Sequence, residues 1–244
     1  MSRALVVSVM LVALLAASCV VKTIEGSGDI DTETRSVSGF DRIDLSHMGE
    51  VHLTQGDTEG LTVRADDNLL EYIVTEVQGG TLRLGVTREA AMAILRPTEP
   101  IVFEVAFREL SGLAVSGSGS FEADSLETES LHMAISGSGN IAISDLIAGD
   151  LSTDISGSGK VKLKGEASSQ SIAVSGSGRY YSLDLATKDA RVAVSGSGLV
   201  ELHASDHLSV GISGSGSVRY AGEPTIDDDI SGSGSLKRID LSSL

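Results

Sequence analysis

The chain has 244 residues, of which 34 are acidic and 18 are Lys or Arg, so its formal net charge at pH 7 is −16. This charge excludes nucleic acid and anionic membrane surfaces as general binding partners. Aromatic residues make up 3% of the chain and tryptophan is missing, which argues against a ligand groove lined with bulky rings. The core is therefore expected to consist of Val, Ile, Leu and Ala.

The first 18 residues have the features of an export signal peptide. Arg3 gives a short basic start, and residues 4–17 form an apolar run too short to span a bilayer as a mature helix. The only cysteine, Cys19, follows "LLAAS", which resembles a bacterial lipobox, although Ala16 stands where Leu is usual. We predict lipidation of Cys19, an anchor segment over residues 19–25 and a location in the bacterial envelope, at the outer membrane. An ordinary secretory signal with an incidental cysteine is the alternative.

Residues 26–115 show the alternation of β-strands only irregularly. Residues 24–30 and 45–51 read as degenerate copies of a glycine corner that becomes regular further on. The stretch "ADDNLLEYIVTEV" predicts a short helix from Asp67 to about Ile73, capped by its two aspartates. "TEVQGGTLRL" predicts two strands joined at the paired glycines. We interpret this part as the irregular first coils of one continuous structure.

Residues 116–244 contain the tetrapeptide "SGSG" seven times, with steps of 20, 20, 19, 20, 18 and 18 residues. Its first serines are Ser116, Ser136, Ser156, Ser175, Ser195, Ser213 and Ser231. Apolar residues occupy every second position on both sides of each copy, which is the period of a strand with one buried face. A unit of this length cannot bury its own face, so the copies must stack. The repeat predicts a single parallel β-helix over residues 26–244 with SGSG at one corner.

The same alternation predicts where the corner side chains point. Steps of two from Ile212 reach Gly214, Gly216 and Val218, so both glycines of a corner are expected to face inward and both serines outward. Tyr180 is expected to point inward and Tyr181 outward.

These outward residues are the candidate surface contacts. The seven first serines either satisfy turn hydrogen bonds or form a flat hydroxyl array that contacts a carbohydrate or another regular surface. Tyr181 is a further candidate contact, with packing at an edge as its alternative role.

The sequence contains few residues that suggest catalysis or metal binding. Asp227, Asp228 and Asp229 precede the last corner and are weak candidates for calcium, but a solvated acidic edge is favoured. His203 and His207 are close in sequence, in a polar loop that is expected to be solvated. No P-loop and no nucleophile elbow is present. We therefore expect no catalytic residues, no metal and no cofactor.

The chain resembles a known protein family over roughly residues 26–244. The pieces "FDRIDL", "LTQGD" and "ADDNLLEYI", together with the later SGSG coils, are similar to the putative auto-transporter adhesin, head GIN domain family (DUF2807). The resemblance implies a right-handed parallel β-helix of pectin-lyase-like type, often on bacterial lipoproteins, with a role in cell adhesion and no enzymatic activity. The chain departs from the family at "SHMG", residues 46–49, where many members have another SGSG-like corner.

Two classes of function follow. The first is a non-enzymatic, adhesin-like lipoprotein that binds a glycan or a surface protein. The second is a structural or self-assembling envelope component, in which the edge of the last coil pairs with a second copy to form a homo-oligomer.

Overall fold

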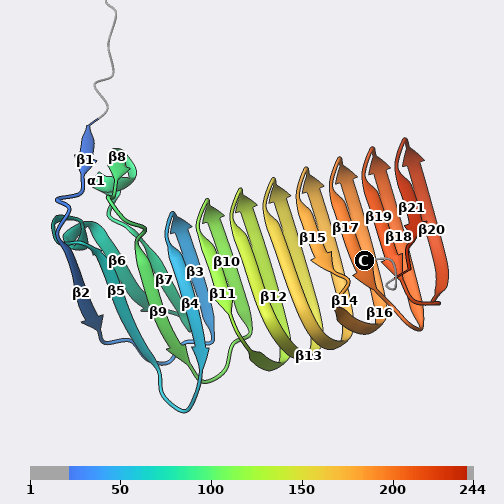
Figure 1. Ribbon diagram of the computed structural model, residues 1–244, viewed down its shortest axis with the longest axis horizontal. Coiled ribbons are helices and arrows are strands. Elements are labelled where there is room, and N and C mark those ends of the chain that lie inside the picture. Colours follow the sequence, from blue (N-terminus) through green and yellow to red (C-terminus); the bar gives the residue numbers. More distant parts are fainter. Residues whose placement is uncertain (1–21, 241–244) are drawn as a thin grey trace, which may run out of the picture.

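The computed structural model describes residues 22–240, so the predicted export signal and Cys19 lie outside the described residues. Within this range the protein consists almost entirely of strands that build a parallel β-solenoid of about six turns (Figure 1). The parallel β-helix predicted from the repeat is confirmed.

The strands divide into an irregular N-terminal part and a regular C-terminal part. The first part contains β1 (Thr23–Glu25), β2 (Ile30–Arg35), β3 (Arg42–His47), β4 (Glu50–Gln55), β5 (Gly60–Asp66), the 3₁₀ helix η1 (Asp67–Tyr72), β6 (Ile73–Gln78), β7 (Thr81–Val86), α1 (Arg88–Ala91), β8 (Ile94–Arg96) and β9 (Val102–Phe107). The second contains β10 (Gly112–Gly117), β11 (Ser120–Ala123), β12 (Leu126–Gly137), β13 (Asn140–Gly157), β14 (Lys160–Gly176), β15 (Arg179–Ser182), β16 (Leu185–Gly196), β17 (Leu199–His203), β18 (His207–Gly214), β19 (Ser217–Ala221), β20 (Thr225–Gly232) and β21 (Ser235–Arg238).

Each coil contributes one segment to each of two long sheets. The first sheet holds the segments that lead into the SGSG corners, in the order β7, β3, β10, β12, β13, β14, β16, β18, β20, all parallel. The second sheet holds the segments that leave the corners, in the order β9, β4, β11, β13, β14, β15, β17, β19, β21, also parallel. Because β13 and β14 bend around the coil, they belong to both sheets.

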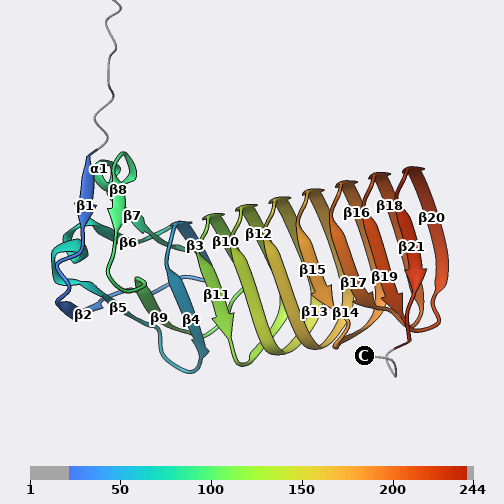
Figure 2. The same cartoon turned by 45° about the horizontal axis from the view of Figure 1, so that its top comes forward.

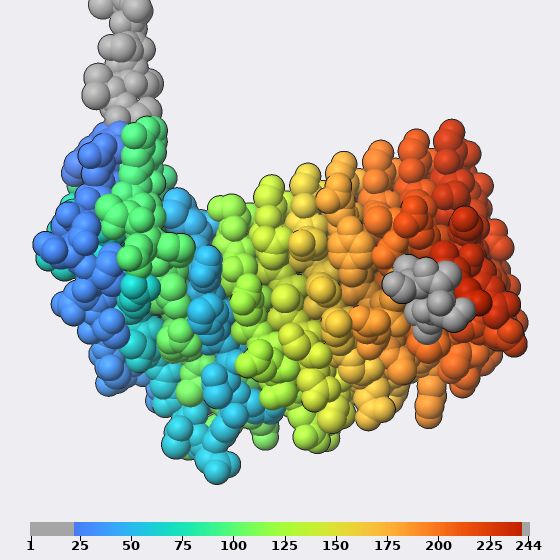
Figure 3. Space-filling view, in the orientation of Figure 1, coloured from blue at the N-terminus to red at the C-terminus, as the bar shows by residue number. Residues whose placement is uncertain are grey.

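Alternate side chains of both sheets point into one continuous core. Equivalent residues stack above one another, as in the column Val115, Ile135, Ile155, Val174, Val194 and Ile212, all at most 2% exposed. A single apolar cluster runs from Phe40 to Tyr220. Each fully buried aliphatic side chain contributes about 1.5–3 kcal/mol relative to exposure, so this burial is what holds the coils together. In the space-filling view the successive coils lie side by side along the long axis, each running across it (Figure 3).

The corners differ from the prediction at the first glycine. The second glycine is buried as expected: a Cβ at Gly159 would lie 2.4 Å from Ile135 Cγ2. The first glycine is not turned into the core. Gly157 has a φ of +118°, and a Cβ there would lie 2.6 Å from the carbonyl oxygen of Gly137 in the preceding corner. Left-handed backbone and close approach to the neighbouring corner, not inward packing, therefore require glycine at this position.

The first corner of the stack shows why the family pattern can be broken there. His47 occupies the place of the first glycine, opposite Gly117, and has a φ of +81°. The neighbour of β3 on its other side is β7, whose pairing with β3 ends at Leu45 opposite Leu84. Within residues 22–240 no preceding corner lies next to His47 to collide with its side chain, so the residue carries only the strain of a left-handed backbone.

The N-terminal part extends the two sheets with antiparallel strands. β2 pairs with β5 and β5 with β9, while β6 and β7 form a hairpin at Gly79 and Gly80, as predicted. The prediction that residues 24–30 form another corner is wrong. Strand β1 pairs instead with β8, and both project with α1 from the N-terminal end (Figures 1 and 2).

Asp66 ties this projecting segment to the body. The predicted helix is present as the 3₁₀ helix η1, but Asp66 makes no capping hydrogen bond. Its fully buried carboxylate accepts hydrogen bonds from Gly28 N (2.9 Å), Thr98 N (2.9 Å) and Thr98 Oγ1 (2.6 Å). Burial opposes ionisation, but the hydrogen bonds from Thr98 and Gly28 outweigh this cost and hold the pKa of Asp66 below its usual value.

The role of the first corner glycine can be tested at Gly157. We expect Gly157→Ala to lower the free energy of unfolding by about 2–4 kcal/mol, because backbone strain and collision with Gly137 add up. Urea unfolding followed by circular dichroism measures the loss. The control is Ser158→Ala in the same corner, where we expect a change within about 0.5 kcal/mol. Equal stability of the two variants would contradict the close-approach explanation.

The buried, hydrogen-bonded carboxylate of Asp66 predicts that the stability of the protein depends on pH. An acid whose pKa is lowered by folding adds stability above its unfolded pKa, near 3.9, and this stability is lost as the pH falls through the folded value. We expect Asp66→Asn to destabilise the protein by about 2 kcal/mol at pH 7 and to weaken the further loss of stability below about pH 4. Asp124→Asn, at an exposed carboxylate, is the control for the change of charge. An Asp66→Asn variant with the acid sensitivity of the wild type would contradict this role.

Candidate functional site

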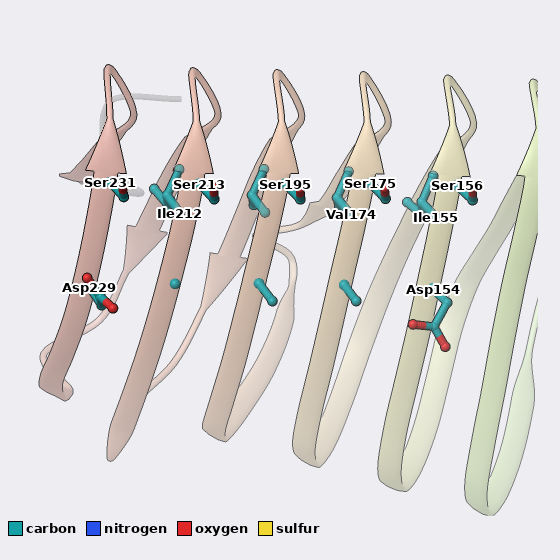
Figure 4. Close-up of a pocket in the computed structure, with 14 residues that line it drawn as sticks. Asp154, Ile155, Ser156, Val174, Ser175, Ser195, Ile212, Ser213, Asp229 and Ser231 are labelled. Carbon is teal, nitrogen blue, oxygen red and sulfur yellow. The ribbon is translucent and has the colours of Figure 1, made fainter.

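The seven first serines lie in one row on the outer side of the first sheet. Strand register places each serine opposite its equivalent in the next coil, from Ser116 to Ser231, and extends the row to Ser46 in β3. Neighbouring strands are about 4.8 Å apart, which sets the repeat of the row. Figure 4 shows five of these serines at the same height beside their corners. We call this surface, with the residues that flank the row, the serine face.

The hydroxyl groups of the seven first serines have no protein partner within residues 22–240, whereas Ser46 donates to the carbonyl oxygen of Leu84 (3.3 Å). All seven serines are exposed, and none of their side chains makes a hydrogen bond there. The corners are held by backbone bonds instead, for example from Ser158 N to Gly137 O at 2.8 Å. The row therefore does not serve to satisfy the turns, and its hydroxyls are free to donate to and accept from a ligand.

Beside the serine row runs a groove with a floor of small residues. Ala173, Ala193 and Gly211 form this floor across three coils. Asp154 on β13 and Asp229 on β20 close it at the two ends (Figure 4). With no side chain larger than a methyl group on the floor, an extended ligand can approach the backbone of the sheet closely. The sequence analysis missed this floor, although its signal is present: the residue two places before the first corner serine is Ala or Gly in most coils.

The carboxylates of the groove are not arranged as a catalytic pair. Asp154 and Asp229 are four strands apart, which corresponds to about 19 Å at the strand spacing of a sheet. The two carboxyl groups of a glycoside hydrolase are about 5–10 Å apart. The arrangement favours binding by hydroxyl groups and shape over acid–base chemistry.

A buried polar network inside the coils has a structural role. Gln170, which is 2% exposed, donates from Nε2 to Thr187 Oγ1 (2.8 Å) and accepts at Oε1 from Tyr180 OH (3.1 Å) and Ser182 Oγ (3.1 Å). Burial raises the pKa of Tyr180 far above its usual value, so the phenol stays neutral. The network is shielded from solvent, which separates it from any ligand at the surface.

Of the remaining predicted residues, only Asp229 lies beside the serine row. Tyr180 is fully buried and Tyr181 lies on the outer side of the second sheet, both as predicted. Asp227 and Asp229 lie on the outer side of β20, whereas Asp228 occupies an inward position opposite Val210. Over residues 22–240, no three His, Cys, Asp or Glu side chains converge to form a metal site.

The comparison with known families decides the assignment. The profile of the putative auto-transporter adhesin, head GIN domain family (DUF2807) matches residues 39–224. The chain belongs to this family. No curated protein matches the chain.

Solved structures similar to this head GIN domain include proteins from Bacteroides and Parabacteroides species. A protein from Bacteroides fragilis, described as a putative adhesin, is 26% identical with a TM-score of 0.81, over 88% of this chain and 100% of that chain. A protein from Parabacteroides distasonis, described as a putative lipid binding protein, is 29% identical with a TM-score of 0.76, over 90% of this chain and 100% of that chain. A putative adhesin from Parabacteroides merdae, 20% identical with a TM-score of 0.72, shares the fold over 90% of this chain and 100% of that chain.

The position of the chain relative to a membrane rests on the sequence. In the part of the chain that the structure describes, none of the helices is long and apolar enough to cross a bilayer. The predicted anchor at Cys19 lies outside this part.

Proposed function

We propose that this protein is a non-enzymatic, lipid-anchored adhesin of the bacterial outer membrane that binds an extended surface glycan along the serine face. The observation that carries the proposal is the row of seven exposed first serines, which have no protein partner in the described part of the chain and lie in register beside a floor of small residues. Glycans present many hydroxyl groups along an extended chain, and the row offers both donors and acceptors to them. The family and the relative described as an adhesin support a role in attachment.

The position of the chain ends suits such a role. β1 and β20 lie at opposite ends of the long axis (Figure 1). An anchor at Cys19, close before β1, would hold one end of the solenoid at the membrane. The serine face would then extend away from the membrane along the coils, with the last coil farthest out.

A second candidate function is self-assembly through the last coil. Within the described residues, β20 and β21 each pair on one side only, with β18 and β19. Ile226 and Ile230, at the open edge, are 38% and 36% exposed. A strand edge with apolar side chains is a template for pairing with another copy.

Two charged residues at the same edge oppose this pairing. Asp228 lies opposite Val210 and Arg238 opposite Tyr220, so charges occupy positions that carry core side chains one coil earlier. Arg238 pairs with Glu223 (2.7 Å) at the surface, so a further coil would have to bury this pair and the Asp228 carboxylate, which is costly. This arrangement ends the stack and favours glycan binding as the main function.

Replacing serines in the row tests the proposed function. We expect the variant with Ser156, Ser175, Ser195 and Ser213 all changed to Ala to bind surface glycans at least about tenfold more weakly than the wild type, because several hydrogen bonds are lost together. Binding of the purified protein to an array of bacterial surface polysaccharides measures this.

The matched control uses the other serine of the same corners. Changing Ser158, Ser177, Ser197 and Ser215 to Ala removes the same number of hydroxyl groups from the same corners and should leave binding unchanged. Equal loss in both variants, or no saturable binding by the wild type, would contradict a role for the serine face.

Removing a charge from the open edge tests the second candidate. We expect Asp228→Val to increase concentration-dependent association, measured by light scattering, because it continues the apolar column of Val210 to the edge. Asp227→Val, which makes the same substitution on the outer side of β20, is the control. If both variants associate to the same extent, the inward position of Asp228 does not limit self-assembly.

A further inference from the structure

A basic cluster lies on the outer side of the second sheet, away from the serine face. In the run "KVKLK" at the start of β14, Val161 and Leu163 are buried, so the three lysines that alternate with them point outward. In the next coil Arg179 pairs opposite Lys160, and Tyr181 opposite Lys162. Lys160, Lys162 and Arg179 are exposed and Tyr181 is half-buried. We call these four residues the basic cluster.

The three cations of the cluster have no acidic partner within residues 22–240. Lys160, Lys162 and Arg179 make no ion pair or side-chain hydrogen bond there. Nearby cations do have partners: Lys164 pairs with Asp184 (3.1 Å) and Arg219 with Glu201 (2.9 Å).

This unpaired charge does not help the fold. Like charges on directly opposite strand positions, as at Lys160 and Arg179, destabilise a sheet. The chain has 34 acidic residues against 18 Lys and Arg, so acidic partners are plentiful in its composition. A cluster that opposes stability and lacks such partners is explained by a ligand that supplies the negative charge.

The cluster forms part of a groove that has room for a ligand. Its residues line a groove of about 790 Å³ together with Leu163, Leu183, Asp184 and Glu201. The two acids there are already paired with Lys164 and Arg219, so the free charge in the groove is positive. The ring of Tyr181 adds a flat apolar surface with a polar end, which suits stacking against a sugar ring.

We propose that the basic cluster binds an acidic polysaccharide that carries carboxylate or sulfate groups. Lys160, Lys162 and Arg179 pair with its anionic groups, and Tyr181 packs against a sugar ring. An anionic bilayer is disfavoured because it would face a wide part of a protein whose net charge is −16, whereas a single anionic chain in the groove meets only the local positive charge of the cluster. The basic cluster lies on the second sheet and the serine face on the first, so loss of ligand binding at one site should leave binding at the other unchanged.

The test is a calorimetric titration of the purified protein with two acidic probes, oligogalacturonate for carboxylates and sulfated dextran oligomers for sulfates. We expect at least one of them to bind, with an affinity that falls as salt rises. Its uncharged counterpart, methyl-esterified oligogalacturonate or unmodified dextran, should bind at least about tenfold more weakly.

Changing both Lys160 and Lys162 to Gln should weaken binding of the acidic probe about tenfold. Tyr181→Ala should weaken it as well, and Tyr181→Phe should not.

The control variant changes Lys188 and Lys237 to Gln, which removes the same charge from exposed lysines outside the groove. It should bind like the wild type, and circular dichroism should show that all variants are folded.

Equal weakening in the two lysine variants would overturn the proposal, as would binding of neither acidic probe. Binding only to phosphatidylglycerol vesicles, lost with Lys160 and Lys162, would also overturn it and assign the cluster to a membrane. The serine variants should bind the acidic probe normally, which separates this site from the proposed function of the serine face.

Discussion

The close approach of one corner to the next is the constraint on which the rest of the structure depends. The N–H of the second corner serine donates to the carbonyl oxygen of the first glycine one coil earlier, at 2.8 Å, and this bond repeats through the stack. A Cβ on the first glycine would collide with the same carbonyl. The repeat can therefore vary its loops freely, with steps of 18 to 20 residues, while the corner keeps its two glycines.

Corners held in this way bring every outward position into register along the stack. Equivalent residues of successive coils follow at about the strand spacing, so one residue type repeated in the sequence becomes a row on the surface. The serine face arises in this manner from the first corner serine and from the small residue two places before it. The same register places Lys160 beside Arg179 and creates the basic cluster. Rows of this kind suit a ligand that is itself a repeating chain.

The two ends of the solenoid are protected in different ways against pairing with another copy. At the N-terminal end, antiparallel strands and the fully buried Asp66 carboxylate close the structure with hydrogen bonds. At the C-terminal end, Asp228 and Arg238 place charge where the core column would continue. Both devices interrupt the period of the repeat, because a regular coil would present a new edge to another copy.

Local periodicity was enough to predict the fold, the seven SGSG corners and the alternation of buried and exposed residues in the strands, but not the corner proposed at residues 24–30 or the direction of the first corner glycine. The inward Tyr180 and outward Tyr181, and the hairpin at Gly79 and Gly80, were predictable for this reason. Features that depend on the neighbouring coil were visible only in the folded protein. It alone showed that the first glycine avoids a carbonyl oxygen of the preceding corner and that Asp66 binds Thr98 and not a helix end. It also showed that the seven first serine hydroxyls and three cations lack partners among residues 22–240. These facts rest on contacts between residues far apart in the sequence, which no local pattern records.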